Sequence, residues 1–215
     1  MKIRNLSQTD SIVQEILREL RDVSIQTDRY RFRKNIERMG TIAAYEISKE
    51  LEYVSRPTST PLGEATTRAL KEQPVIATVL RAGLPLQSGV NQLFNQADLA
   101  YISAYRKHST PTAFEVVVEY LACPSLTDRV LILTDPMLAT GQSLVLTYQQ
   151  FLRHGKPSKV HLVSVIGSEQ GVSYVQEHIP EATLWIGTID PFLNEAGYIV
   201  PGLGDAGDLS FGMKE

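Results

Sequence analysis

Short apolar runs that alternate with helical patterns constrain the fold of this 215-residue chain more than any other feature. Six runs rich in Val, Ile and Leu occur at 75–80, 99–105, 116–120, 130–134, 160–166 and 183–189. Several of them are continuous rather than alternating, which is typical of strands covered on both faces. Strands that alternate with helices favour a parallel sheet with right-handed crossovers. The sequence therefore predicts the α/β class, with a mostly parallel central sheet flanked by helices.

A helical pattern precedes these runs. Ile36, Met39, Ala43 and Ile47 follow one another at spacings of three or four residues, which places an apolar stripe on one face of a helix. We therefore predict a helical N-terminal part over residues 1–70, with a break at the proline and glycine residues of 56–63.

Two further predictions concern the second half of the chain. Between the fourth and fifth apolar runs, Leu144, Tyr148 and Phe151 share one helix face, and Gly155 suits the C-cap. The tail from Phe192 onward is rich in Gly and Pro, and we expect it to be an ordered loop region over the end of the sheet.

The composition restricts the class of protein. The length suits one domain over residues 1–215, with 43% hydrophobic and 21% charged residues. The 21 Lys and Arg residues against 24 Asp and Glu, with no basic run, argue against nucleic acid as a main partner. No apolar stretch reaches the roughly 18 residues of a membrane span. Cys123, the single cysteine, cannot form an internal disulfide, and we expect a cytoplasmic protein.

The segment 130–143 runs from an apolar strand into an acid, a loop of small residues and a helix. Ligands of open α/β sheets bind at the carboxyl ends of the strands. Residues 139–143 offer backbone N–H groups at a helix N-terminus, which suits a phosphate, and Asp135, expected at an exposed strand end, can accept hydrogen bonds from sugar hydroxyls. The segment predicts a site for a phosphorylated sugar. The alternative is an ordinary turn with a Ser or Thr side chain capping the helix.

Arg81 stands at the end of the first apolar run, and Ala82, Gly83 and a helix start follow it. A guanidinium in this place can bind a phosphate or diphosphate in a fixed fork. The alternative is an arginine that only solvates the strand end, which is the commoner situation for this residue type.

Gly202, Gly204 and Gly207 form a G-x-G-x-x-G pattern near the end of the chain. A dinucleotide-binding turn of this kind lies between a strand and a helix and needs an acid about twenty residues later. Pro201 interrupts any strand, and the chain ends eight residues after the pattern, so we reject that interpretation. What remains is a loop whose backbone can approach a planar ligand and read its edge through N–H and C=O groups, or a structural C-terminal loop.

In this order, the three segments resemble the uracil phosphoribosyltransferase family, over most of the chain from about Arg29 to Lys214. Residues 135–141, Asp-Pro-Met-Leu-Ala-Thr-Gly, are similar to that family's motif for phosphoribosyl diphosphate (PRPP), and residues 80–84 to its diphosphate loop. Tyr105 and Arg106 resemble the start of its flexible β-arm. Residues 197–208 are closely similar to its uracil-binding hood and are the most specific of these motifs.

The resemblance implies the type I phosphoribosyltransferase fold, with a C-terminal hood over 190–215, and the conversion of uracil and PRPP to UMP and diphosphate. The residues it implies as catalytic are Asp135, Arg106 and Asp205. Those implied for PRPP binding are Arg81, Arg106, Asp135, Pro136, Met137, Leu138, Ala139, Thr140, Gly141, Gln142, Ser143 and Asp205. Those implied for uracil binding, through the main chain, are Ile199, Gly204, Asp205 and Ala206. The family also implies Mg²⁺ carried on PRPP without protein metal ligands, a homodimer or higher homo-oligomer, and GTP as a candidate effector.

Some residues depart from the family's pattern. Gln142 replaces a usual second glycine in the phosphate loop, Pro85 and Ser88 replace usual residues after the diphosphate loop, and Leu209 replaces a frequent basic residue. These departures bear on rate and regulation more than on the choice of base, because the hood sequence is intact.

Two other function classes stay open at this point. A PRPP-sensing regulator of the same fold that binds RNA would need a basic face, which the charge balance disfavours. A generic domain that binds a phosphorylated sugar would show no turnover that depends on Asp135.

Overall fold

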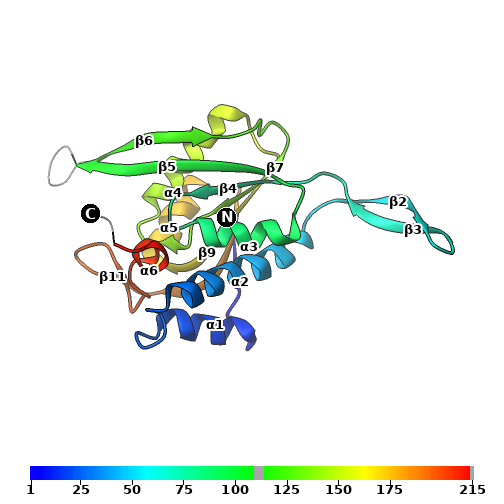
Figure 1. Cartoon of the computed structure of the whole chain (residues 1–215). Helices are drawn as coiled ribbons and strands as arrows, with labels where there is room; N and C mark the ends of the chain where they lie inside the picture. Colours follow the sequence, from blue (N-terminus) through cyan, green and yellow to red (C-terminus); the bar gives the residue numbers. More distant parts are fainter. Residues whose placement is uncertain (109–113, 214–215) are drawn as a thin grey trace.

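The computed structural model describes residues 1–108 and 114–213, and the side chains of residues 104–117 lie outside that description. Its centre is an eight-stranded sheet (Figure 1). From one edge to the other the strands are β1 (Lys2–Asn5), β10 (Thr183–Asp190), β9 (Lys159–Ser168), β7 (Val130–Thr134), β4 (Val75–Val79), β5 (Asp98–His108) and β6 (Phe114–Ala122). The short strand β8 (Met137–Leu138) pairs with β9. Only the β5–β6 pair within this sheet is antiparallel among the described residues, which confirms the prediction of a mostly parallel sheet.

Helices cover both faces of the sheet (Figure 1). One face carries α1 (Ile12–Arg21), α2 (Arg29–Ser48) and α3 (Leu84–Leu93), and the other carries α4 (Gln142–Phe151) and α5 (Glu169–His178). A single turn of 3-10 helix, η1 (Leu152–His154), continues α4 up to Gly155. The helix predicted between the fourth and fifth apolar runs is therefore confirmed.

The strand β7 shows why its sequence is a continuous apolar run. Ile132 packs into the core under α1, α2 and α3, whereas Leu131 and Leu133 pack into the core under α4 and α5. All three side chains are fully buried. Successive side chains point to opposite faces, so a strand that is covered on both sides buries nearly all of its side chains and is mostly apolar. The exception is Thr134 at the end of β7, which is buried and whose hydroxyl donates to the carbonyl of Ala77 at 3.0 Å.

The helices α2 and α3 cross at very short range through two glycines. A Cβ atom built on Gly89 would lie 1.9 Å from the carbonyl oxygen of Glu37, and one built on Gly40 would lie 2.3 Å from the carbonyl oxygen of Leu86. Only the absence of side chains at both positions allows this contact. The crossing sets the position of α3, which begins immediately after the turn that carries Arg81.

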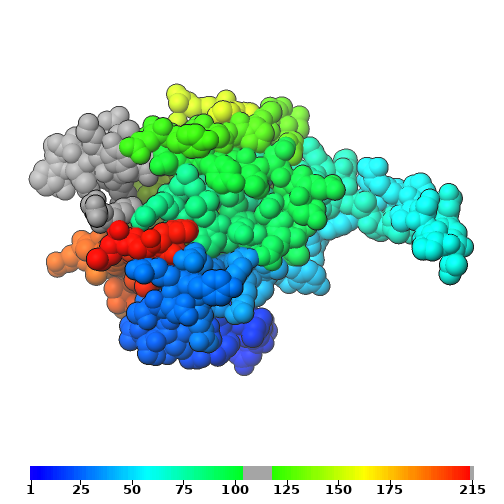
Figure 2. All heavy atoms as spheres, in the orientation of Figure 1, coloured from blue at the N-terminus to red at the C-terminus, as the bar shows by residue number. Residues whose placement is uncertain are grey.

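The prediction of a helical N-terminal part over residues 1–70 is wrong in two places. Residues 2–5 form the edge strand β1, which pairs in parallel with β10. Residues 53–70 form a hairpin of β2 (Tyr53–Thr60) and β3 (Gly63–Leu70) that projects away from the rest of the molecule (Figures 1 and 2). Its Thr-rich sequence with Pro57 and Pro61 suits an extended chain better than a helix, because proline breaks helical hydrogen bonding and β-branched residues favour strands.

The tail also contains more regular structure than a loop. It forms a small antiparallel pair of β11 (Phe192–Leu193) and β12 (Ile199–Val200) and a short helix, α6 (Ala206–Phe211). The tail lies at the end of the sheet, as expected (Figure 1). The expectation of loop alone is wrong, because the Asp205 side chain caps the N-terminus of a helix, α6, within it. Within residues 1–108 and 114–213, no helix combines the length and the apolar character needed to cross a membrane.

Candidate active site

A cavity of about 280 Å³ opens at the carboxyl ends of β4 and β7. Three segments that are far apart in the sequence line it, namely the turn after β4, the turn after β7 and residues 197–207, which we call the hood loop. The lining residues are Val79, Leu80, Arg81, Ala82, Asp135, Met137, Ala139, Gly197, Tyr198, Gly204, Asp205, Ala206 and Gly207. The structure thus brings together the three segments that the sequence singled out.

Asp135 occupies the wall of this cavity directly after β7. Its backbone N–H donates to the carbonyl of Val163 at 3.0 Å, and the Ser164 hydroxyl donates to its carbonyl oxygen at 2.7 Å. Its Oδ1 accepts a hydrogen bond from the N–H of Met137 at 3.3 Å. Burial raises the pKa of this carboxyl to about 6. The expectation of an exposed strand end is wrong, because the Asp135 side chain is partly buried in the cavity wall.

A smaller cavity of about 110 Å³ adjoins the first at the N-terminus of α4. Its lining residues are Asp135, Met137, Leu138, Ala139, Thr140, Gly141, Ser143 and Leu144. The N-cap of α4 is Gly141, which has φ of 76° and no side chain, so the N-cap position itself is not a Ser or Thr. A Cβ atom on Gly141 would lie 2.7 Å from the carbonyl oxygen of Gly171. The first N–H groups of a helix have no partner within the helix, which makes this small cavity suited to an anion.

Arg81 reaches from the turn after β4 toward the C-terminal helix. Its Nη2 donates to the carbonyl of Gly212 at 3.3 Å and lies 3.5 Å from Oδ1 of Asp208. Its Nε is buried with no hydrogen-bond partner. A Cβ atom on Gly83 would lie 2.0 Å from the hydroxyl oxygen of Thr78, so the turn that presents Arg81 needs a glycine there. Arg81 lies in the turn two residues after the end of β4 and lines the cavity.

The hood loop brings three glycines, Gly197, Gly204 and Gly207, to the cavity wall, where no side chain separates their backbone from a ligand. Gly204, Asp205 and Ala206, which the sequence predicted for base binding, all line it. Ile199 does not line it, because it lies in β12, but its neighbours Gly197 and Tyr198 do. The Asp205 carboxylate caps α6 by accepting a hydrogen bond from the N–H of Asp208 at 2.9 Å.

Several predicted PRPP-binding residues lie elsewhere or outside the description. The backbone of Arg106 lies in β5, opposite Val116 of β6, and its side chain and that of Tyr105 are outside the described residues. Gln142 begins α4 and lines neither cavity, and Pro136 is buried with its carbonyl accepting from Val165. The other predicted residues of this motif line one or both cavities.

Six residues line the main cavity although no binding role was predicted for them individually, namely Val79, Leu80, Ala82, Gly197, Tyr198 and Gly207. They lie within or next to the segments that were singled out, so the length of those segments was the signal that could have found them.

The residues present suit a metal ion that arrives with its phosphate ligands. In the part of the chain that the structure describes, no three His, Cys, Asp or Glu side chains form a metal-binding group. Asp135 and Asp205 are the two carboxylates of the main cavity. One or two carboxylates together with substrate phosphates are a common Mg²⁺ environment, whereas a site built from protein alone needs more oxygen ligands.

Known proteins resemble this chain over its whole length. The family model of uracil phosphoribosyltransferase matches residues 7–213. A uracil phosphoribosyltransferase of Porphyromonas gingivalis is 47% identical over 215 residues, which cover 100% of both chains. One of Pyrococcus furiosus is 37% identical over 203 residues, covering 93% of this chain and 86% of the relative.

Solved structures resemble this chain in fold. A protein of Aquifex aeolicus superposes with a TM-score of 0.86 at 28% identity, covering 98% of each chain. A hypoxanthine phosphoribosyltransferase of Staphylococcus aureus, at 12% identity and TM-score 0.52, covers 86% of this chain and 84% of its own and shares the fold alone. The fold is that of the type I phosphoribosyltransferases, and the chain belongs to the uracil phosphoribosyltransferase family.

Proposed function

We propose that the main cavity and the adjoining phosphate cavity carry out the family's reaction, in which uracil and PRPP give UMP and diphosphate. The observation that carries the proposal is the common lining of one cavity by Asp135, Arg81 and the backbone of the hood loop. A sugar diphosphate and a planar base must meet in one place for this pentosyl transfer, and each of these three elements suits one part of that pair.

The sugar phosphate is assigned to the turn after β7, which carries the PRPP motif. The small cavity at the N-terminus of α4 is lined by Ala139, Thr140, Gly141 and Ser143, and it suits the 5-phosphate. Asp135 lies between that cavity and the main one, where its carboxylate can accept hydrogen bonds from both ribose hydroxyls.

The diphosphate is assigned to Arg81 and Arg106, with Asp205 facing it from the hood loop. Arg81 supplies a planar group of donors at the cavity wall, and Arg106 is carried by β5, the strand next to β4. Mg²⁺ carried on the diphosphate would supply charge neutralisation for the leaving group.

The base is assigned to the hood loop, with Ile199, Gly204 and Ala206 reading uracil through their main chain. Support comes from the backbone of Gly204, Asp205 and Ala206 in the cavity wall, where N–H and C=O groups match the alternating donors and acceptors of a uracil edge. Tyr198 lines the same wall and offers an aromatic side chain beside it.

The reaction needs charge stabilisation rather than a nucleophilic side chain. The bond between the anomeric carbon and the diphosphate oxygen breaks, the bond from that carbon to uracil N1 forms, and N1 loses its proton. Negative charge grows on the diphosphate, beside Arg81, while the ribosyl centre becomes cationic, near Asp135. Fixed charges in a partly closed site stabilise such a transition state more than water does.

We include self-association in the proposal and assign it to the β2–β3 hairpin. This hairpin forms a two-stranded sheet of its own with nearly every residue exposed, and Leu62 at its tip is 99% exposed. A free two-stranded hairpin is at best marginally stable in water, so packing against a second copy would stabilise it. Replacing 54–69 by a short glycine linker should convert a dimer to a monomer in analytical ultracentrifugation, and a monomeric wild-type protein would contradict the assignment. GTP as effector stays a prediction, checked by adding it to the turnover assay.

The proposal is tested by incubating the protein with PRPP, Mg²⁺ and radiolabelled uracil and measuring UMP and diphosphate. We expect one diphosphate per UMP and release that depends on uracil. Equal turnover of hypoxanthine or adenine would contradict the base assignment. Filter binding of RNA in the same samples distinguishes the regulator class, because RNA binding without turnover would favour that alternative.

A further inference from the structure

The carboxylate of Asp190 and the guanidinium of Arg21 form a paired contact behind the hood loop. Arg21 Nη2 lies 2.6 Å from Oδ1 of Asp190, and Arg21 Nη1 lies 2.8 Å from Oδ2. The Asp190 side chain is 6% exposed and that of Arg21 is 26% exposed. The contact is bidentate and mostly shielded from water, which is the geometry in which an arginine–carboxylate pair is strongest.

The same two side chains also hold the peptide of Gly202 in the hood loop. The N–H of Gly202 donates to Oδ2 of Asp190 at 2.8 Å, and its carbonyl oxygen accepts from Nη1 of Arg21 at 3.0 Å. Gly202 has φ of 63°, and a Cβ atom there would lie 2.0 Å from the carbonyl oxygen of Ile199. The ion pair therefore supplies hydrogen-bond partners for both the N–H and the C=O of Gly202.

Gly202 is well placed to control the base-reading backbone. It stands two residues before Gly204, the first of the four consecutive residues that line the cavity. Leu203, between them, is buried in the core formed with α1 and α2. The conformation of Gly202 therefore sets where Gly204 and Asp205 face.

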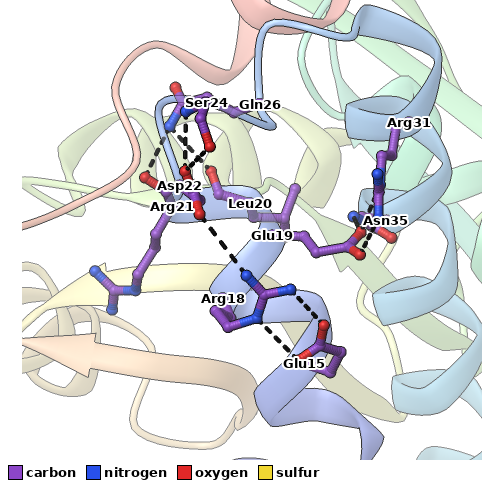
Figure 3. Close-up of polar contacts among 10 residues, drawn as sticks. All are labelled: Glu15, Arg18, Glu19, Leu20, Arg21, Asp22, Ser24, Gln26, Arg31 and Asn35. Atoms are coloured by element: carbon purple, nitrogen blue, oxygen red, sulfur yellow. Dashed lines mark hydrogen bonds and ion pairs between the residues drawn. The ribbon is translucent and has the colours of Figure 1, made fainter.

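The pair is itself fixed by the N-terminal helices. Arg21 is the last residue of α1, and the Gln26 side chain donates to its carbonyl at 3.0 Å. Two residues earlier, Glu19 accepts hydrogen bonds from Arg31 and from Asn35 of α2, the latter at 2.7 Å (Figure 3). Figure 3 shows the side chain of Arg21 directed away from these contacts and from the ion pair of Arg18 with Glu15. Arg21 is thus held in place by its helix and is free of competing carboxylates on that helix within the described residues.

We propose that Arg21 and Asp190 are positioning residues that hold the hood loop in the conformation that reads the base. They act through Gly202 and do not touch the substrates. The inference rests on the proposed assignment of the hood loop to uracil, and it gives the N-terminal helix α1 a role in base selection. The sugar phosphate site, built on the turns after β4 and β7, does not depend on this pair.

The test compares steady-state kinetics of Arg21→Met with those of Arg18→Met, a matched control that removes an exposed arginine from the same helix. We expect the uracil KM of Arg21→Met to rise about tenfold, as it would if the reading conformation were populated a tenth of the time. The PRPP KM should rise by less than the uracil KM, because Asp205 is the one proposed PRPP contact in the hood loop, whereas Arg81, Asp135 and the small cavity lie on other turns. Arg18→Met should leave both constants unchanged.

Two further readouts separate positioning from general stability. Asp190→Asn should resemble Arg21→Met, and the double variant should be no worse than the poorer single variant, because both act through one contact. Amide hydrogen exchange over 199–205 should be faster in Arg21→Met, with no change in α4 or β7. Should Arg21→Met fail to fold, Arg21→Lys carries the test, because lysine keeps the charge without the fork and should give an intermediate uracil KM.

An equal rise of the uracil and PRPP KM values, or an unchanged uracil KM, would overturn the inference. 3-Methyluracil, which lacks the N3–H donor, distinguishes this failure from failure of the hood assignment. A wild-type enzyme that uses 3-methyluracil as well as uracil would overturn the hood assignment itself. Rejection of 3-methyluracil by the wild type, together with an unchanged uracil KM in Arg21→Met, would overturn only the role of Arg21 and Asp190.

Discussion

The guanidinium of Arg81 lies 3.5 Å from the carboxylate of Asp208, so the proposed diphosphate-binding cation contacts an acid of the C-terminal helix. PRPP would compete with this acid for Arg81. Both side chains are more than a third exposed, and such pairs contribute about 0.5 kcal/mol. Asp208→Asn should therefore lower the PRPP KM by about twofold, measured at low ionic strength.

The Asp205 carboxylate accepts its hydrogen bond from the backbone N–H of Asp208, which Asp208→Asn keeps. The cap of α6 is therefore unchanged in this variant, and a change in the PRPP KM reports on the lost carboxylate. A rise in the PRPP KM would mean that Asp208 orients Arg81 for the diphosphate instead of competing for it.

The raised pKa of Asp135 predicts how kcat/KM for PRPP depends on pH. Burial raises its pKa from 3.8 to about 6, so in the folded protein the carboxylate predominates only above that pH. If the anion accepts hydrogen bonds from the ribose hydroxyls, kcat/KM for PRPP should fall by about tenfold per pH unit below 6. A pH–rate profile measures this.

The variant Asp135→Asn is the control for that profile. A phosphate group also titrates near pH 6, so a fall of kcat/KM below pH 6 that persists in the variant is caused by the substrate. We expect Asp135→Asn to have lower turnover than the wild type at pH 8. The part of the fall below pH 6 that is caused by the Asp135 carboxyl should be absent from its profile. Wild-type turnover in Asp135→Asn would contradict the role of Asp135 and favour a generic phosphate-sugar site.

The same shift predicts an effect on stability. A folded-state pKa above the unfolded value means that the fold favours the protonated carboxyl, and that contribution is lost as the pH rises through about 6. The neutral Asn side chain avoids burying the anion, so Asp135→Asn should raise Tm at pH 8, with a gain that shrinks toward pH 5. Thermal denaturation at the two pH values checks this, and an equal change at both would show that ionisation is not the cause.

The crossing of α2 and α3 predicts a large effect from one methyl group. In Gly89→Ala the new Cβ would meet the carbonyl of Glu37 at 1.9 Å, so the helices must separate. We expect the free energy of unfolding to fall by about 1–3 kcal/mol in urea denaturation. Ser88→Ala, at the exposed neighbouring position, should change it by less than about 0.5 kcal/mol. Equal effects would show that the close approach is not the cause.

Local patterns predicted much of this fold. Residues 130–134 were predicted as a strand and form β7 with those bounds, because a strand that is covered on both faces carries a nearly continuous apolar run. The hairpin at 53–70 was not predicted, since none of its faces is buried and its sequence carries no core pattern. The partial burial of Asp135 was missed because the other segments of its cavity, the turn after β4 and the hood loop, are distant from it in the sequence.

The candidate site was predictable where its motifs are continuous. Arg81, Asp135 and the hood loop were all found, and the structure places them around one cavity. The contact of Arg21 with Asp190 was not predicted, because the two residues are 169 positions apart and neither belongs to a motif. Pairings of this kind depend on the packing of α1 against the sheet, which a single sequence does not show.

A crystal structure of the protein with UMP tests the central claim most directly. We predict the phosphate at residues 139–143, the ribose hydroxyls within hydrogen-bond distance of Asp135, and the base against the backbone of 204–206. Nucleotide bound at any other place, or in this cavity with the base directed away from the hood loop, would contradict the account.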